Sequence, residues 1–237
     1  GGVVNGLSFS EWKAPDGSIT LQVPQGWTAV EKQADKCTVN WAARNPAGTS
    51  SAFMNNQIMV LKSEDARQMY ASYGIAAAAS APISGYLGAE QALSGVVAPL
   101  SGSSDVKIVY RDAQSSSVYS QGVCIAGLAA CDAQVFEVAY THAGVQMRGM
   151  YMVQSFDFGE GTTWWISIWG YEAPAAEWGS TNAVLQKTFA SVSYTPDWAS
   201  KCGTAASAAN VIREVIIDRQ NAADRSAQAW DAYIRGG

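Results

Sequence analysis

The sequence has little charge. Asp, Glu, Lys and Arg make up only 15% of its 237 residues, compared with about 25% in a typical soluble protein. The formal net charge is −5, and no segment concentrates Lys and Arg as phosphate-binding proteins do. These features argue against a nucleic-acid partner, and the polar surface must come largely from Ser, Thr, Gln, Asn and Gly.

Long apolar runs are also missing. The longest candidate, "GIAAAASAPISGYLGA", is interrupted by Gly, Pro and Ser and falls short of the roughly 18 apolar residues that a membrane span needs. We therefore expect no transmembrane span, which leaves peripheral association with a membrane open. The opening "GGVVNGLSFSEW" lacks the basic start and apolar segment of a signal peptide, so we expect a mature or trimmed chain.

Histidine is nearly absent, and no familiar catalytic or nucleotide-binding motif occurs. His142 is the only histidine and no CxxC pair is present, so we predict neither a metal site nor a cofactor. The P-loop, GxGxxG, HExxH and GxSxG patterns are missing as well. We therefore predict no catalytic residues and a protein that is not an enzyme.

Three weaker enzymatic signals remain. Asp157 and Glu160 in "FDFGEG" are a carboxylate pair of the kind used in glycoside hydrolysis or calcium binding, although two acids in a hairpin loop are also typical of a solvated turn. Ser104 and Lys107 match an SxxK pattern, but they open a predicted strand, where residues three apart point to opposite faces. A hydrolase that uses Asp157, Glu160 or the turn residue His142 is the enzymatic alternative.

Four cysteines permit three pairings. Cys124 and Cys131 enclose the short loop "IAGLAA", which a disulfide can close, and Cys37 would then pair with Cys202. The alternative is four free thiols in a reducing compartment. We favour two disulfides, which indicate a secreted, periplasmic or cell-surface protein because such bonds persist in oxidising compartments.

The chain is long enough for one large domain or for one domain with an extension. "LSFSEWKA" and "SITLQVPQGW" flank the turn "PDGS" and predict a hairpin. "TVNWAAR" and "NQIMVLK" predict two further strands. A helix is expected to begin at Ser63, a capping hydroxyl followed by two acids, and "GAEQALSGVVAPL" predicts a second helical piece.

From Asp105 onward the pattern predicts an antiparallel meander. Its expected strands are "DVKIVYRDA", "SSVYSQGV", "DAQVFEVAYT", "GVQMRGMYMVQSF" and "TTWWISIWGYE". "AEWGSTNAVLQKTFASVSY" follows with helical spacing at Val184, Leu185, Thr188 and Phe189, which predicts an amphipathic helix packed on the sheet.

The last part of the chain has a different character. We expect residues 197–206 to be a linker and residues 207–237 to form one long amphipathic helix, with an apolar stripe that Arg219 interrupts. Such a stripe must be buried, against the chain's own sheet, a protein partner or a second copy of the chain. The residues of this stripe that we propose for binding are Ile212, Ile216, Trp230 and Ile234.

Two stretches resemble a known family. "APDGSITLQVPQGWTAVEK", a hairpin whose second strand ends in Pro-x-Gly-Trp, resembles the opening of PsbP-like domains, and "AVLQKTFASVSY" is similar to their last helix. This fold includes the extrinsic PsbP subunit of photosystem II, the yeast Ran-binding Mog protein and DcrB-type bacterial lipoproteins. The resemblance covers residues 8–196 and implies an antiparallel sheet with helices on both faces. It also implies a non-enzymatic accessory or binding role.

The segment "GTTWWISIWGYEAP" is unusually rich in aromatic residues. Strand alternation places Trp164, Ile166 and Ile168 on one face, with a gap at Gly170, and it places Trp165, Ser167, Trp169 and Tyr171 on the other. The second face is expected either to lie under the helix of residues 175–190 or to line a binding groove. Trp165, Trp169 and Tyr171 are therefore candidate ligand contacts.

A further candidate contact is the loop between Cys124 and Cys131, which carries Ile125 and Leu128. Exposed apolar residues tend to mark interfaces, although a loop folded back on the domain explains them too. Together, these features predict an α+β domain of PsbP-like type over residues 1–196 with a helical extension. We expect a non-enzymatic, extracytoplasmic protein that binds a partner, with a small-ligand carrier as the alternative.

Overall fold

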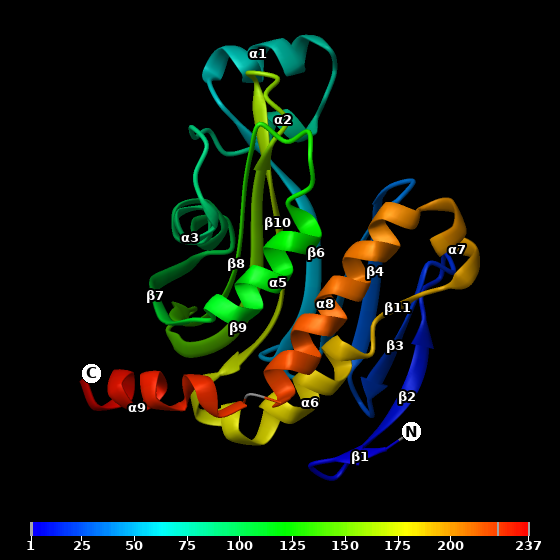
Figure 1. Cartoon of the computed structure of the whole chain (residues 1–237), viewed down its shortest axis with the longest axis vertical. Coiled ribbons are helices and arrows are strands. Elements are labelled where there is room, and N and C mark those ends of the chain that lie inside the picture. The colour runs from blue at the N-terminus through cyan, green and yellow to red at the C-terminus, as the bar shows by residue number, and fades with distance from the viewer. Residues whose placement is uncertain (1, 222, 237) are drawn as a thin grey trace.

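The computed structural model describes residues 2–221 and 223–236. The chain forms two antiparallel sheets, a seven-stranded one with the order β4-β5-β6-β10-β9-β8-β7 and a four-stranded one with the order β1-β2-β3-β11. Helices lie on both sides of the large sheet (Figure 1). This arrangement confirms the predicted α+β class with an antiparallel sheet between helical layers.

The small sheet contains the hairpin that was predicted near the start. Its strands are β1 (Val3–Val4), β2 (Leu7–Lys13), β3 (Ile19–Pro24) and β11 (Ser193–Tyr194). Ile19, Leu21 and Val23 are buried because alternate residues of β3 point into the main core.

The large sheet is built on three long strands. Its members are β4 (Thr28–Asp35), β5 (Thr38–Arg44), β6 (Ser51–Leu61), β7 (Ser103–Arg111), β8 (Ala130–His142), β9 (Val145–Asp157) and β10 (Thr163–Pro174). Strands β8, β9 and β10 have 13, 13 and 12 residues and pair along most of their length. Both faces of β9 and β10 are largely buried, so these strands are apolar on both sides.

One face of the large sheet has a thick helical cover. The helices α5 (Ala113–Val123), α6 (Trp178–Ala190) and α8 (Gly203–Asn221) lie there. The ring of Tyr171 stacks on Trp178 at a centroid distance of 5.9 Å and meets Phe189 edge-on. Aromatic pairs of this kind stabilise a core beyond their buried area.

The other face has a thinner cover. Residues 89–100 form α3 (Ala89–Ala92), the π-helical turn η1 (Leu93–Val97) and α4 (Ala98–Leu100). Their apolar side chains pack on residues of β8, β9 and β10, including Phe136, Val138, Val153 and Trp164. This segment is the second helical piece predicted from the sequence.

The helix predicted at Ser63 is also present. The Ser63 hydroxyl accepts a hydrogen bond from the Ala66 amide at 3.1 Å, and α1 (Glu64–Ser72) follows with two acids in its first turn. Together with α2 (Ala77–Ser80) it forms one end of the molecule (Figure 1). Among the described residues, no helix combines the length and the apolar character that crossing a bilayer requires.

One strand prediction is wrong. "SSVYSQGV" belongs to α5, not to the meander. Asp112 caps this helix by accepting a hydrogen bond from the Ser115 amide, and the hydroxyl of Ser116 accepts one from the Val135 amide. The Asp112 carboxylate and the Ser116 hydroxyl thus both have hydrogen-bond partners. These bonds stabilise "SSVYSQGV" as part of a helix, although its sequence alternates as in a strand.

The prediction for the last part of the chain also needs correction. The expected linker contains most of α7 (Pro196–Lys201) and the beginning of α8, and the expected single helix is interrupted by η3 (Ala223–Ser226) before α9 (Ala227–Gly236). Ile212 and Ile216 are each 1% exposed and Trp230 is 5% exposed, whereas Ile234 is 68% exposed. Most of the predicted stripe therefore packs on the chain's own core, where α8 lies against α5 and α6.

Both predicted disulfides are present. Cys37 bonds to Cys202 across a sequence separation of 165, and Cys124 bonds to Cys131 across a separation of 7. The first bond connects the beginning of β5 to the junction between α7 and α8. It therefore fixes the helical tail to the sheet.

The two disulfides should contribute unequally to stability. In the chain-entropy model, closing the long loop contributes about 5 kcal/mol to the free energy of unfolding, and closing the short loop contributes about 2.5 kcal/mol. Urea unfolding of the Cys37→Ser/Cys202→Ser double variant should therefore show the larger loss, with Cys124→Ser/Cys131→Ser as the matched control. Equal losses would contradict this account.

Candidate functional site

A groove of about 1120 Å³ lies on the thinly covered face of the large sheet. Seven strands spaced about 4.8 Å apart make a sheet roughly 29 Å wide, whereas one helix is about 10 Å across. The segment of residues 89–100 therefore leaves part of this face open. Side chains of η1 and α4 form one wall, among them Leu93, Val97 and Leu100, and strands β5, β6, β8, β9 and β10 form the floor.

The floor of the groove carries three aromatic rings. The ring centroid of Tyr151 lies 6.0 Å from that of Phe53 and 6.2 Å from that of Tyr140. Ile168 and Met147 line the groove beside them. Because these residues come from β6, β8, β9 and β10, strand pairing holds them in fixed relative positions.

A carboxylate lies on this floor. The hydroxyls of Tyr140 and Tyr151 both donate hydrogen bonds to Oε2 of Glu172, and the hydroxyl of Ser51 donates to its Oε1 at 3.2 Å. Burial, followed by the negative charge of Glu172, raises the pKa of each tyrosine above its ordinary value. Both tyrosines therefore remain protonated at neutral pH and act as donors.

Two glycines make room for the Tyr151 ring. A Cβ atom at Gly149 would lie 2.8 Å from Cζ of Tyr151, and one at Gly170 would lie 2.6 Å from its Cδ1 and 2.3 Å from the carbonyl oxygen of Met150. Without side chains at these positions, the ring lies flat across β9 and β10 and its hydroxyl reaches Glu172. The gap that the sequence places at Gly170 is thus filled by Tyr151.

The groove is not on the aromatic face that the sequence analysis proposed. Trp169 and Tyr171 are only 4% and 1% exposed and pack in the core under α6, while Trp165 is partly exposed. The alternative prediction, coverage by a helix, is therefore correct for Trp169 and Tyr171. The face of Gly170 and Glu172 is the one that remains open.

The three residues of the enzymatic alternative do not share a site. His142 lines one end of the groove, where its Nδ1 lies 3.5 Å from the Ser103 hydroxyl. Asp157 lies at the other end of β9 from His142. At about 3.3 Å per residue, this strand separates the two residues by roughly 40 Å. Glu160 is in the turn that follows Asp157. Asp157 pairs with Lys62 at 2.6 Å. Although burial raises the pKa of Asp157, the hydrogen bonds from Lys62 and Gly159 lower it overall.

The SxxK pair has separate partners. The Ser104 hydroxyl donates to Asp105, and the Lys107 ammonium lies over the Tyr233 ring of α9 at 5.9 Å. These contacts agree with a strand, not with the helical turn that an acyl-enzyme pair needs. Within residues 2–221 and 223–236, no group of three or more His, Cys, Asp or Glu side chains is placed to hold a metal ion.

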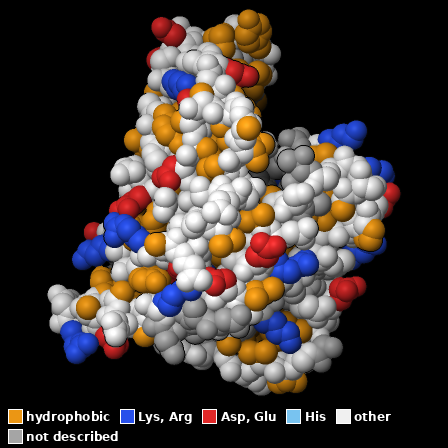
Figure 2. Space-filling model, viewed as in Figure 1, with side chains coloured by type: hydrophobic (Ala, Val, Ile, Leu, Met, Phe, Trp, Pro, Cys, Tyr) orange, Lys and Arg blue, Asp and Glu red, His pale blue; other side chains and the backbone are white. Residues whose placement is uncertain are grey.

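The disulfide-closed loop lies beside the turn between β9 and β10, since the Ala129 amide donates to the Asp157 carbonyl. Ile125 is 57% exposed, and Leu128 is partly buried. Figure 2 shows charged side chains scattered without a stripe of one sign, and apolar side chains at the end where α1 and α2 lie. A contact role for Ile125 and Leu128 stays a prediction.

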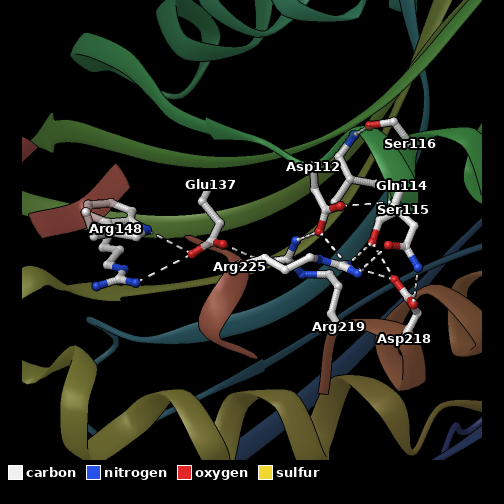
Figure 3. Close-up of polar contacts among 11 residues, drawn as sticks. Asp112, Gln114, Ser115, Ser116, Glu137, Arg148, Asp218, Arg219 and Arg225 are labelled. Atoms are coloured by element: carbon white, nitrogen blue, oxygen red, sulfur yellow. Dashed lines mark hydrogen bonds and ion pairs between the residues drawn. The ribbon is translucent and has the colours of Figure 1, made fainter. Parts of the chain in front are cut away.

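A cluster of charged residues attaches the tail to the sheet (Figure 3). Arg219 pairs with Asp112 at 2.6 Å and with Glu137 at 2.7 Å. Arg225 pairs with Asp112 at 3.0 Å and with Asp218 at 2.8 Å. Arg219 can therefore occupy the apolar stripe of the tail, because Asp112 and Glu137 form ion pairs with it. Without these partners, a buried positive charge at this position would destabilise the fold.

The same cluster holds α9 through an indole ring. Trp230 donates its ring N–H to Glu137 at 2.9 Å and covers the guanidinium of Arg148, which lies 3.7 Å from the ring centroid. Although burial raises the pKa of Glu137, the charge of Arg219 and hydrogen bonds from Ser226, Arg219 and Trp230 lower it overall. Glu137 therefore connects β8 to both parts of the tail as a carboxylate.

Comparison with known proteins identifies similar folds only. No protein-family model and no curated protein matches the sequence. The Ran-binding protein Mog1p of Saccharomyces cerevisiae is similar at 10% identity and a TM-score of 0.29, covering 89% of this chain and 91% of that one. A second Mog1 structure, a point mutant, is similar at 11% identity and a TM-score of 0.27, covering 88% of this chain and 91% of that one.

Cyanobacterial PsbP from Synechocystis sp. PCC 6803 is also similar, at 10% identity and a TM-score of 0.28, covering 82% of this chain and 95% of that one. The similar structures thus come from the fold family that the sequence resembles. At TM-scores this low the likeness carries no argument.

Gly170→Ala should disturb the groove floor. The new methyl group would collide with the Met150 carbonyl and displace the Tyr151 ring, so we expect the free energy of unfolding in urea to fall by about 1–3 kcal/mol. Gly179→Ala is the control, since nothing lies within 4 Å of a Cβ atom there. A neutral effect of Gly170→Ala would contradict the described packing.

Glu137→Gln should weaken the attachment of the tail in a pH-dependent way. Removing one partner of a buried pair costs about 3–5 kcal/mol. Because the pKa of Glu137 is lower in the folded than in the unfolded chain, its contribution is complete above the unfolded value of about 4.3 and is lost as pH falls through the folded pKa. Urea unfolding should therefore show that the variant loses more free energy of unfolding, relative to the native protein, at pH 7 than at pH 3. The exposed Glu177→Gln serves as the control.

Proposed function

We propose that the protein is a non-enzymatic binding protein that holds a partly apolar small molecule in the groove. The observation that carries this proposal is the composition of the groove, with apolar walls, an aromatic floor and the Glu172 carboxylate held there by three hydroxyls. Small-molecule sites usually combine apolar walls with a few convergent polar groups in about 300–1,000 Å³. The volume of about 1120 Å³ is close to that range.

The position of the ionisable residues favours binding over catalysis. His142 and the Asp157–Glu160 turn lie at opposite ends of β9, so they cannot act on one substrate. The groove holds Glu172, whose two oxygens accept hydrogen bonds from the hydroxyls of Ser51, Tyr140 and Tyr151. The hydroxyls of Tyr140 and Tyr151 have raised pKa values because they are buried beside this carboxylate, which makes them poor nucleophiles. This arrangement suits the recognition of a ligand.

The burial of the tail supports the groove over the tail as the main binding site. Ile212, Ile216 and Trp230 pack on the body, and ion pairs fix Arg219 and Arg225. A partner that bound the apolar stripe of the tail would first have to break these contacts. Of the four predicted stripe residues, Ile234 is the one that is largely exposed.

The two disulfides support an extracytoplasmic location as part of the proposal. Such bonds persist in oxidising compartments and are uncommon in the cytosol. A carrier or sensor of a partly apolar molecule outside the cytoplasm agrees with this chemistry and with the low charge of the chain.

Binding of the neutral fluorescent probe N-phenylnaphthylamine tests the proposal. Ala42 and Val97 line opposite sides of the groove, so the Ala42→Trp/Val97→Trp variant should fill it. We expect saturable binding by the native protein and an increase in Kd of at least about tenfold in the variant, equivalent to about 1.4 kcal/mol.

Ala227→Trp is the matched control, because Ala227 is exposed on α9 and does not line the groove. Its Kd should equal that of the native protein. Thermal unfolding should first show that both variants are folded. The proposal fails if the native protein shows no saturable binding. It also fails if the Ala42→Trp/Val97→Trp variant binds the probe as tightly as the Ala227→Trp control.

A further inference from the structure

The carboxylate on the groove floor has only neutral partners. Glu172 accepts hydrogen bonds from Tyr140, Tyr151 and Ser51. No Lys or Arg side chain of the described residues forms an ion pair with it, whereas Asp112, Glu137 and Asp157 all have such partners. Glu172 is partly buried, and carboxylates that are withdrawn from water are usually paired with a cation. The groove therefore contains an acidic side chain that forms no ion pair with the described residues.

The hydrogen bonds among the described residues use three acceptor positions of this carboxylate and leave one. A carboxylate offers about four lone-pair positions, two on each oxygen. Both tyrosine hydroxyls use Oε2, while Ser51 uses one position on Oε1. Glu172 lines the groove, so a donor that enters the groove has one unoccupied acceptor position at Oε1.

The surrounding rings favour a positively charged donor. Phe53, Tyr140 and Tyr151 form the aromatic floor next to Glu172, and the faces of aromatic rings attract cations, most strongly where water is excluded. Phe53 is only partly buried, so a ligand can reach its ring.

Arg44 is a groove-lining cation in the same row of the sheet as Glu172. Arg44 is the cross-strand neighbour of Ser51 on β5, and Ser51 is the neighbour of Glu172 on β10, so the three residues form one row across the sheet. Arg44 is exposed and lines the groove. Its positive charge competes electrostatically with a cationic ligand for Glu172.

We propose that the groove selects ligands that carry an ammonium group, which donates a hydrogen bond to Oε1 of Glu172 while the apolar part of the ligand lies along Phe53 and η1. This inference rests on the proposed function and adds the chemical class of the ligand. Charge-assisted hydrogen bonds of this type are stronger than neutral ones, so the ammonium group supplies selectivity and the apolar walls supply general affinity.

Three probes with one skeleton test the inference on the native protein. Phenylbutylamine, phenylbutanol and phenylbutyrate share an aromatic chain and differ in the charge of the head group. By isothermal titration calorimetry we expect the amine to bind at least about tenfold more tightly than the alcohol, and the carboxylate to bind more weakly than either. Equal affinity for amine and alcohol overturns the inference.

Glu172→Gln identifies the group responsible. The variant keeps a carbonyl acceptor for the tyrosines but loses the charge, so the amine should bind no more tightly than the alcohol, whose affinity should stay within about twofold of the native value. Glu31→Gln is the matched control, because Glu31 also borders the groove, near its edge on β4, and should keep the native preference. A preference for the amine that survives Glu172→Gln overturns the inference.

Arg44→Gln is a second variant that leaves the aromatic floor unchanged. Removing this competing cation should strengthen amine binding severalfold, and a weaker binding would contradict the inference. If none of the three probes binds although N-phenylnaphthylamine does, the ammonium class is wrong and the proposed function stands. If N-phenylnaphthylamine also fails to bind the native protein, the proposed function itself is wrong.

Discussion

The packing of β10 between two apolar layers is the constraint on which the rest of the structure depends. Trp164, Ile166 and Ile168 point into one layer, and Trp169 and Tyr171 point into the other. Burying this much apolar surface on both sides of one strand is the main source of stability in such a domain, at about 25 cal/mol per Å². Other elements must cover each apolar layer to keep it from water, and the helices cover the two faces of the sheet to different extents.

The difference between the two covers creates the groove. On one face, α5, α6 and α8 pack on the sheet, and the tail is held there by the Cys37–Cys202 bond and by Arg219 between Asp112 and Glu137. On the other face, the short segment of residues 89–100 covers only part of the sheet. The tail therefore belongs to the structural cover of one face, and the groove lies on the opposite face.

Strand pairing and hydrogen bonds hold the side chains of the groove floor in place. Gly149 and Gly170 let the Tyr151 ring lie flat, and the hydroxyls of Tyr140, Tyr151 and Ser51 fix the orientation of the Glu172 carboxylate. All of these groups are on paired strands, so a ligand would meet a site that is already formed and loses little side-chain freedom on binding. Rigid scaffolds with a few fixed polar groups are well suited to selecting a ligand by the chemistry of one functional group.

The sequence by itself determined the local features of this protein. Strand alternation identified the two faces of β10, the Ser63 cap located α1, and the cysteine spacing indicated both disulfides, because each depends on short-range geometry or on simple pairing. Strand alternation also places Glu172 on the same face as Trp164, Ile166 and Ile168, which is a polar signal for the site within the sequence. Local pattern also misassigned α5, whose serines are stabilised by β8 and the tail. Only the tertiary structure decided which sheet face stays open and where the tail packs, because these outcomes depend on contacts between segments more than 100 residues apart.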